Sequence, residues 1–272
     1  MASKIEFAVQ MTCESCANSV KSSLAGVPGV NNVTVSLPEE TVIVETTLPS
    51  SEIQKLIESS GRRAILKGYG DSAKAGHQGA AVAMLGGLTG SALGDVKGVV
   101  RFVQVDEDTC VVDGTLDGLS PGPHGLHVHE CGDLSQGCDS IGEHFNPYKT
   151  QHGSPKDEPQ MRHAGDLGNI TADENGRATF RLTDRVLKVW DLIGRSVAVT
   201  EKEDDLGRGN SPESTVNGNS GTRLACGIIA RSAGMFENSK KICACDGVSL
   251  WDERDKPLAG PGRRTETYTA NL

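Results

Sequence analysis

GLHVHE (residues 125–130) is a short run in which His127 and His129 alternate with apolar neighbours. Side chains two residues apart on a β-strand point to the same face, so both imidazoles can reach one metal ion. Similar alternating runs surround it, separated by turns rich in Gly, Asp and Pro: VVRFVQV, TCVVDGTL, RATFRLTD, RSVAVTE and ACGIIARS. Residues 80–234 are therefore predicted to form an antiparallel β-barrel or sandwich.

Two long segments with little regular pattern interrupt this β-rich region, at about residues 131–168 and 201–222. Loops of such length in a compact domain are usually functional. The first segment contributes His144, His152, His163 and Asp166. Together with His127 and His129, five of the seven histidines thus lie within 37 residues, and an aspartate follows the last by three residues. The pattern therefore predicts a metal site.

These motifs, together with GCDSIGEHFNP, EDDLGRGN and GNSGTRLACGII, closely resemble those of the Cu,Zn superoxide dismutase family. The resemblance implies a Greek-key barrel with a zinc loop and an electrostatic loop. It assigns zinc to His144, His152, His163 and Asp166. It also implies that Asp204 steadies the ligand histidines from behind, and that Cys138 and Cys226 form an intrasubunit disulfide, an exception to the reduced state of cytosolic thiols.

The copper site of that family is incomplete in this sequence. Three of its four positions hold histidine, namely His127, His129 and the bridging His144, but the fourth is Thr200. A neutral hydroxyl is a poor copper ligand beside imidazole. Arg223 occupies the position that guides superoxide in the dismutase family. We nevertheless expect the copper site of this domain to be vestigial and the domain not to be an enzyme.

The dismutase family forms dimers, and its interface positions correspond here to Gly132, Ile193, Gly194 and Ile228. A domain with this surface is predicted to pair with a true enzyme subunit as one half of a pseudo-symmetric dimer. Pairing with a second copy of the same chain stays open. Two further cysteines, Cys110 and Cys131, are expected to be small buried side chains.

Residues 1–69 show a different pattern, in which strand-like and helix-like segments alternate. KIEFAVQ, VNNVTVSL, ETVIVETTL and RRAILKG predict strands. One helix is expected after MTCESC, and a second is expected to begin with a capping box formed by Ser51 and Gln54. The order βαββαβ is the ferredoxin-like arrangement. The chain is thus predicted to be multidomain, with an α+β domain preceding the all-β barrel.

Cys13 and Cys16 of MTCESC lie in the loop before the first predicted helix. A helix N-terminus favours the thiolate form of a nearby cysteine. C-x-x-C by itself is ambiguous between a redox pair and a metal clasp. Two thiolates without a third protein ligand suit Cu(I) better than tetrahedral zinc. The motif and the whole domain resemble the heavy-metal-associated domain of small copper chaperones.

The remaining segments carry little regular pattern. Residues 70–79 form a predicted linker rich in Gly and Ala, and residues 235–272 form a predicted tail that is mostly irregular. The tail contains Cys243 and Cys245, whose thiolates are favoured by the adjacent Lys240 and Lys241. Such a pair can pass a soft ion by ligand exchange or attack a thiol or disulfide of another protein.

The order of the three parts resembles the family of metallochaperones that load copper into Cu,Zn superoxide dismutase. This resemblance implies Cu(I) as the transferred ion, Zn(II) in the barrel, a heterodimer with the enzyme, and help in forming the intrasubunit disulfide of the enzyme. Cys13, Cys16, Cys243 and Cys245 would bind and transfer copper. The sequence does not identify the protein that supplies the copper.

Charge and hydropathy exclude some classes of function. The net charge of −9 argues against nucleic-acid binding, which needs a concentrated basic face. The sequence contains no apolar run of about 18 residues, so no membrane span is expected. The N-terminus lacks an apolar signal core, which predicts an intracellular protein. The resemblance implies a cytoplasmic location and leaves room for pools in the mitochondrial intermembrane space and the nucleus.

Two alternatives remain open at this point. One is a bifunctional protein with weak superoxide dismutase activity of its own, and Thr200 argues against it. The other is a metal buffer or sensor without a protein client, which would bind metal but form no complex with the enzyme.

Overall fold

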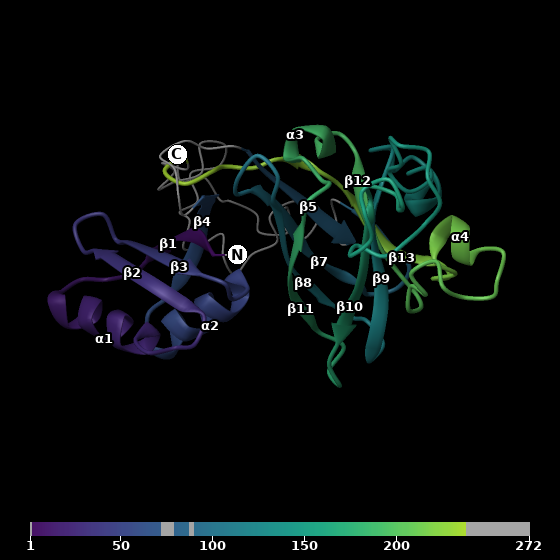
Figure 1. The fold of residues 1–272 in the computed structure, drawn as a ribbon. Coiled ribbons are helices and arrows are strands. Elements are labelled where there is room, and N and C mark those ends of the chain that lie inside the picture. Colours follow the sequence, from purple (N-terminus) through teal and green to yellow (C-terminus); the bar gives the residue numbers. More distant parts are fainter. Residues whose placement is uncertain (1, 72–78, 87–89, 238–272) are drawn as a thin grey trace, which may run out of the picture.

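The computed structural model describes residues 2–71, 79–86 and 90–237, which form two domains side by side (Figure 1). The first domain has the predicted βαββαβ order. Its elements are β1 (Ser3–Val9), α1 (Glu14–Leu24), β2 (Val30–Ser36), β3 (Thr41–Thr46), α2 (Ser50–Ser59) and β4 (Ala64–Asp71). The sheet has the antiparallel order β2-β3-β1-β4, and both helices cover one of its faces. β4 continues two residues beyond the predicted boundary at residue 69.

The second domain consists of two five-stranded sheets, which confirms the all-β prediction. One sheet has the order β10-β9-β12-β13-β6 and the other β11-β8-β7-β5-β14. Their strands are β5 (Ala80–Gly86), β6 (Ser91–Ala92), β7 (Lys97–Gln104), β8 (Cys110–Asp117), β9 (Gly122–His129), β10 (Asp166–Ala172), β11 (Ala178–Asp184), β12 (Ser196–Thr200), β13 (Arg223–Ile228) and β14 (Ala230–Arg231). One continuous apolar core lies between the sheets and includes Val100, Phe102, Leu126 and Val128.

Short helices and long loops complete the barrel. They are a 3-10 helix (Gly137–Asp139), α3 (Val189–Leu192) and α4 (Ser214–Asn217). The two segments with little pattern in the sequence are the long connections before β10 and before β13, and Figure 1 shows them at the same side of the barrel. Among the described residues, no helix is long and apolar enough to cross a membrane.

The predicted capping box at the start of α2 is wrong. The helix begins one residue earlier, after Pro49, and the hydroxyl of Ser51 is buried without a hydrogen-bond partner. The backbone N–H of Ser50 donates instead to Asp113 of β8 at 2.8 Å, and the Ser50 hydroxyl donates to the same carboxylate. A carboxylate at a helix N-terminus satisfies orphan N–H groups and interacts favourably with the helix dipole. The barrel therefore caps a helix of the first domain.

Further contacts extend this seam between the domains. Tyr69 of β4 donates its hydroxyl to Asp113 at 3.2 Å, and Arg181 of β11 donates to the Tyr69 hydroxyl at 2.7 Å. Burial, and then the charge of Asp113, raise the pKa of Tyr69 far above its usual range, so its hydroxyl keeps its proton. Apolar residues of β7 and β8 pack into the core of the first domain, among them Val103 and Val111. The two domains therefore share one buried interface.

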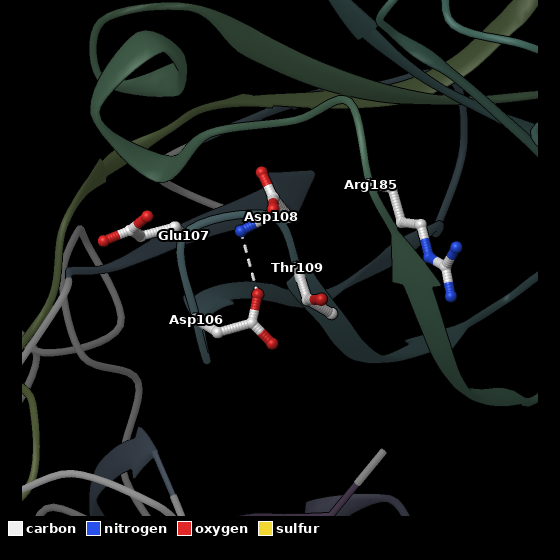
Figure 2. A pocket seen from close by; sticks show the side chains of 5 residues that line it. All are labelled: Asp106, Glu107, Asp108, Thr109 and Arg185. Carbon is white, nitrogen blue, oxygen red and sulfur yellow. Dashed lines mark hydrogen bonds between the residues drawn. The ribbon is translucent and has the colours of Figure 1, made fainter.

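A hollow of about 680 Å³ lies at the turn between β7 and β8, lined by Asp106, Glu107, Asp108, Thr109 and Arg185 (Figure 2). Its acidic residues have local roles in the turn. The Asp106 carboxylate accepts the N–H of Asp108 at 2.8 Å, and the side chain of Lys188 donates to the Glu107 carbonyl and to Asp108. This hollow lies apart from the histidine cluster described next.

Candidate metal centres

Four predicted zinc ligands from the first long loop and the start of β10 meet around one point. Oδ1 of Asp166 lies 2.9 Å from Nδ1 of His144, 3.0 Å from Nδ1 of His152 and 3.3 Å from Nδ1 of His163. A tetrahedral ion with bonds of about 2.0–2.1 Å holds its ligand atoms about 3.3 Å apart. All four residues are buried. The spacing fits a zinc ion.

The orientation of the rings supports the same fit. Nδ1 of His152 and Nδ1 of His163 are buried without a hydrogen-bond partner, although each lies near Asp166. A buried polar atom without a partner is costly. Nitrogen atoms that converge on a carboxylate oxygen without hydrogen-bonding to it are placed as ligands of a shared ion.

Burial and the histidine contacts shift the pKa values of this cluster strongly. Burial raises the pKa of the Asp166 carboxyl, but the three neighbouring imidazoles more than offset this effect and hold it well below its usual range. Burial lowers the pKa of His144 to about 3. Burial also lowers the pKa of His152, whereas the nearby carboxylates of Asp166 and Asp204 bring it to about 9. Asp166 is thus an anion, the form that binds a cation.

Asp204 joins the zinc cluster to the vestigial copper site. Its Oδ1 lies 2.7 Å from Nε2 of His152, and its Oδ2 lies 2.9 Å from Nε2 of His127. Although these three residues could themselves surround an ion, the carboxylate occupies the Nε2 atoms and leaves both Nδ1 atoms for metals. A carboxylate bonded to the second nitrogen orients a ligand imidazole in this way.

The three histidines of the vestigial copper site also lie together. The rings of His127 and His144 stack with centroids 4.0 Å apart, and the ring of His129 lies 5.1 Å from that of His144. Nδ1 of His129 lies 3.0 Å from the carbonyl of Gly142, which leaves Nε2 buried and without a partner. Nδ1 of His127 is likewise buried without a partner. Three imidazoles therefore face this site.

Thr200 does not replace the missing imidazole. Its hydroxyl donates to the carbonyl of Gly125 at 3.2 Å, and a hydroxyl is a weaker copper ligand than a histidine nitrogen. His124, which the sequence analysis did not single out, contacts the backbone of Thr200. Nδ1 of His124 is 2.8 Å from the Thr200 carbonyl, and Nε2 is 2.8 Å from the Ser120 carbonyl. His124 therefore ties backbone segments together instead of serving as a ligand.

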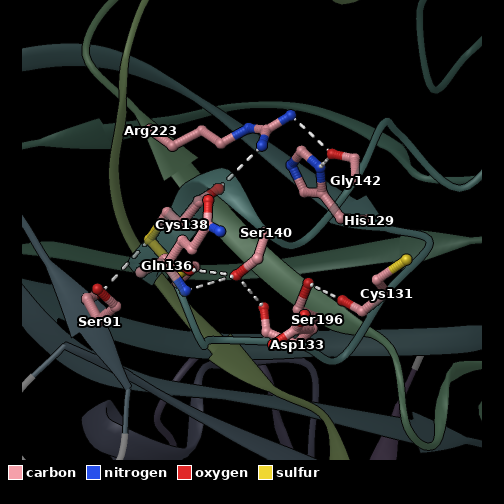
Figure 3. Close-up of a disulfide and its surroundings, with 12 residues drawn as sticks. Ser91, His129, Cys131, Asp133, Gln136, Cys138, Ser140, Gly142, Ser196 and Arg223 are labelled. Carbon is pink, nitrogen blue, oxygen red and sulfur yellow. Dashed lines mark hydrogen bonds between the residues drawn. A yellow bond between two sulfur atoms is a disulfide. The ribbon is translucent and has the colours of Figure 1, made fainter.

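The structure joins Cys138 and Cys226 by a disulfide, which anchors the first long loop to β13 (Figure 3). Arg223 holds the same loop, because its guanidinium donates to the carbonyls of Cys138 and Gly142 at 2.9 and 2.7 Å. Since Gly142 also lies against Nδ1 of His129, the disulfide loop, the arginine and a copper-site histidine form one connected set.

The paired cysteines of the first domain lie at the N-terminus of α1. Sγ of Cys13 is 3.2 Å from Sγ of Cys16, and Cys13 is exposed whereas Cys16 is buried. Hydrogen bonds from the Thr12 backbone and then from the Cys13 side chain lower the pKa of Cys16 to about 6. Cys16 is therefore mostly a thiolate at neutral pH. We call Cys13 and Cys16 the clasp; one exposed and one anionic sulfur allow it both to bind a soft ion and to release it.

The predicted docking residues lie on one exposed region of the barrel. Ile193 and Ile228 are 46% and 40% exposed, and Trp190 of α3, which the sequence analysis missed, is 54% exposed. Gly132 approaches the backbone of Gly194 so closely that a Cβ would lie 2.2 Å from the Gly194 carbonyl oxygen. Exposed aromatic and aliphatic side chains next to a compact backbone contact are typical of a protein–protein interface.

The two remaining described cysteines differ from each other. Cys110 is fully buried, as expected, and burial and the charge of Asp184 raise the pKa of its thiol. The prediction for Cys131 is wrong, because Cys131 is exposed beside Gly132. Its carbonyl accepts the Ser196 hydroxyl at 2.7 Å, so the backbone is held while the side chain faces outward (Figure 3). Cys243 and Cys245 lie outside the described residues.

Comparison with known proteins agrees with this arrangement. The heavy-metal-associated domain matches residues 6–63, and the copper/zinc superoxide dismutase family matches residues 96–229. Human and mouse proteins named "Copper chaperone for superoxide dismutase" are 57% and 56% identical to this chain over 260 residues, which cover 96% of this chain and 92% of each relative. This chain belongs to the family of copper chaperones for superoxide dismutase.

Membership of the copper chaperone family confirms the resemblance noted in the sequence. The barrel is also similar to an enzyme: the Cu-Zn superoxide dismutase A of Xenopus laevis is 52% identical over 145 residues, 52% of this chain and 93% of the enzyme. The mammalian relatives that cover nearly the whole chain are named chaperones and not enzymes, in agreement with the non-enzyme prediction.

Proposed function

We propose that this protein binds Cu(I) at the clasp and delivers it to Cu,Zn superoxide dismutase, on which its barrel docks. One observation carries the proposal: a barrel with a complete set of zinc ligands lacks one copper ligand, at Thr200, and is joined to a domain whose paired cysteines include the exposed Cys13. Such a barrel has the shape of the enzyme without its redox centre. A chaperone needs the shape for docking, whereas copper is handled by sulfur.

Zn(II) in the barrel is part of this proposal. His144, His152, His163 and Asp166 would hold it, with Asp204 orienting His152 from behind. When bound, the ion would offset the charge of Asp166 and satisfy the buried ring nitrogens, so it would stabilise the long loop. The disulfide between Cys138 and Cys226 closes the same loop onto β13.

Docking would use the surface around Gly132, Gly194, Ile193 and Ile228, with Trp190 at its margin. Dismutase-like subunits can pair through the same patch on both partners. The exposed apolar side chains of this patch would be buried on pairing, which would stabilise the dimer. Because the exposed thiol of Cys131 lies in this patch, pairing of the chain with itself need not match the strength of pairing with the enzyme.

The tail would complete delivery. In our proposal Cys243 and Cys245 take part in moving copper and in forming the intrasubunit disulfide of the enzyme. Cu(I) passes between thiolates by ligand exchange without changing its oxidation state. Formation of the enzyme disulfide removes two electrons, which an external oxidant such as oxygen must accept.

The deciding experiment is metal analysis of the full chain, alone and after mixing with copper-free, zinc-loaded dismutase. We expect Cu(I) on the chaperone before mixing, a heterodimer of one chain of each protein by size and mass, and copper in the enzyme together with dismutase activity afterwards. Metal binding without any heterodimer would indicate a buffer or sensor instead. Dismutase activity of the chaperone alone would indicate a bifunctional enzyme.

We further propose a cytoplasmic location, with additional pools in the mitochondrial intermembrane space and the nucleus. The support is the family resemblance alone. Fractionation of cells followed by detection of the chain in each compartment tests it, and a chain recovered only from another compartment would contradict it.

A further inference from the structure

The chain that follows the last barrel strand crosses to the first domain. β14 pairs with β5, and the N–H of Ser232 still donates to the carbonyl of Ala80 at 2.9 Å. Two residues later, Gly234 forms a parallel bridge with Tyr69 of β4. Residues 234–237, which we call the strap, therefore lie on the domain that carries the clasp and include the first three residues of the predicted tail, 235–272.

β4 is shaped to receive the strap. Gly68 and Gly70 flank Tyr69, and both glycines are buried. A Cβ on Gly68 would lie 2.4 Å from the carbonyl oxygen of Gly234, and a Cβ on Gly70 would lie 2.9 Å from Cγ of Met235. Contacts this short do not occur for real side chains. The backbone of the strap can therefore approach β4 only because position 68 is glycine, whereas a Cβ at position 70 would require the Met235 side chain to move.

Glu6 of β1, the sheet partner of Gly68, also binds the strap. Its side chain is 2% exposed, its Oε2 accepts the N–H of Phe236 at 2.7 Å, and its Oε1 pairs with Nζ of Lys67 at 3.0 Å. Within the strap, the N–H of Gly234 donates to the carboxylate of Glu237 at 3.0 Å. Hydrogen bonds to an ionised acceptor are about twice as strong as neutral ones. The strap is thus held by shape and by charge.

We propose that Glu6, Gly68 and Gly70 form a positioning site for the tail, so that the tail starts from the clasp domain and not from the barrel. The inference rests on the proposed function, because the starting point matters only if Cys243 and Cys245 handle copper. The reach is adequate: Cys243 follows Phe236 by seven residues, and Cys13 follows Glu6 by seven. Seven residues span at most about 25 Å.

Release of the strap would move the origin of the tail back to Ser232 on the barrel. The tether to Cys243 would then have eleven residues in place of seven. Effective concentration falls with about the −3/2 power of tether length, which gives a loss of roughly twofold from length alone. The displaced origin would add to this loss. Strap release should therefore slow any step that brings the tail thiols to the clasp.

The test uses the full zinc-loaded chain and two variants that disturb the site in different ways. Gly68→Ala places a methyl group against the carbonyl of Gly234, and Glu6→Gln removes the carboxylate charge without adding bulk. Lys67→Gln is the matched control, because it removes the ion pair but leaves the acceptor of the Phe236 N–H. We expect hydrogen exchange at Phe236 to accelerate about tenfold or more in both variants, and to stay near wild type in the control.

The second readout is the rate at which copper-free dismutase becomes active. Both strap variants should slow it at least about twofold, with unchanged Cu(I) stoichiometry at the clasp and unchanged affinity for the enzyme. Unchanged exchange at Phe236 would refute the strap contact, and faster exchange with an unchanged activation rate would refute its positioning role. If the wild-type chain delivers no copper at all, the proposed function fails and the positioning role fails with it, while the exchange data still decide whether the strap is held.

Discussion

Replacement of Asp113 by alanine should loosen the seam between the two domains. Asp113 is 1% exposed and accepts the N–H and hydroxyl of Ser50 and the hydroxyl of Tyr69. It also lies between two cations on neighbouring strands, since its Cα partners are Arg101 on β7 and Arg181 on β11. Alanine at this position removes the acceptor for all three donors and the charge that separates the two arginines.

The expected loss of stability at the interface between the domains follows from these contacts. Removal of one partner from a buried charged network costs about 3–5 kcal/mol, and loss of a helix N-cap accounts for about 1 kcal/mol of that range. Burial already lowers the pKa of Arg101, and Asp113 partly offsets this effect. Loss of the carboxylate would therefore disfavour the charged form of Arg101 further. We expect Asp113→Ala to lower the stability of the interface between the domains by about 3–5 kcal/mol. Asp113→Asn, which keeps one acceptor oxygen, should lower it by about 1.5–3 kcal/mol.

Hydrogen exchange at the Ser50 amide is the suitable assay, because a two-domain chain need not unfold in one step. A loss of about 3–5 kcal/mol corresponds to exchange faster by roughly two to three and a half orders of magnitude. Asp117→Ala provides the control on the same strand. Asp117 pairs with Arg177 at 2.6 Å, but the two side chains are 39% and 45% exposed, so this pair should contribute no more than about 1 kcal/mol. If Asp113→Ala changed exchange at Ser50 no more than the control does, the capping argument would be wrong.

Three further outcomes are expected. Thr200→His should raise superoxide disproportionation by the copper- and zinc-loaded chain above the nearly absent activity that we expect of wild type, because it supplies the missing imidazole; equal activities in a standard dismutase assay would contradict this. The double variant Cys243→Ser with Cys245→Ser should lose enzyme maturation while zinc content and circular dichroism stay unchanged, and retained maturation would exclude a role for the tail. The thiolate absorbance of Cys16 should appear on raising the pH through about 6, since the lowered pKa favours the anion above that value. Cys13→Ala should move this midpoint upward, because it removes the hydrogen-bond donor at position 13, and an unshifted midpoint would show that the Cys13 hydrogen bond is not a cause.

Local patterns were sufficient to predict the elements of the first domain and the all-β class of the second, although none of the quoted runs covers β5, β6 or β10. The alternation around His127 and His129 placed both rings on one face of a strand, and the number of histidines in the following loop indicated a metal site, whose zinc ligands the resemblance to a known family then assigned. Resemblance to known families assigned the disulfide and identified Thr200 as the departure from the copper site. These inferences succeed because strand periodicity and metal-ligand chemistry depend on residue type and spacing.

Contacts between distant segments could not be predicted in the same way. The capping box at Ser51 was a sound local pattern, yet a carboxylate 63 residues away from Ser50 caps the helix instead. Cys131 is exposed in the loop just after the end of β9, a position that the pattern of apolar residues does not reveal.

By itself, then, the sequence determined the two domains and the ligand chemistry, because each depends on residue types at short or characteristic spacings, and its resemblance to a known family identified the missing imidazole. Only the tertiary structure decided that Asp113 joins the domains and that Glu6 and two glycines hold the strap. The physical reason is that a buried hydrogen bond or a close backbone approach depends on which surfaces the fold brings together, and the partners lie far apart along the chain.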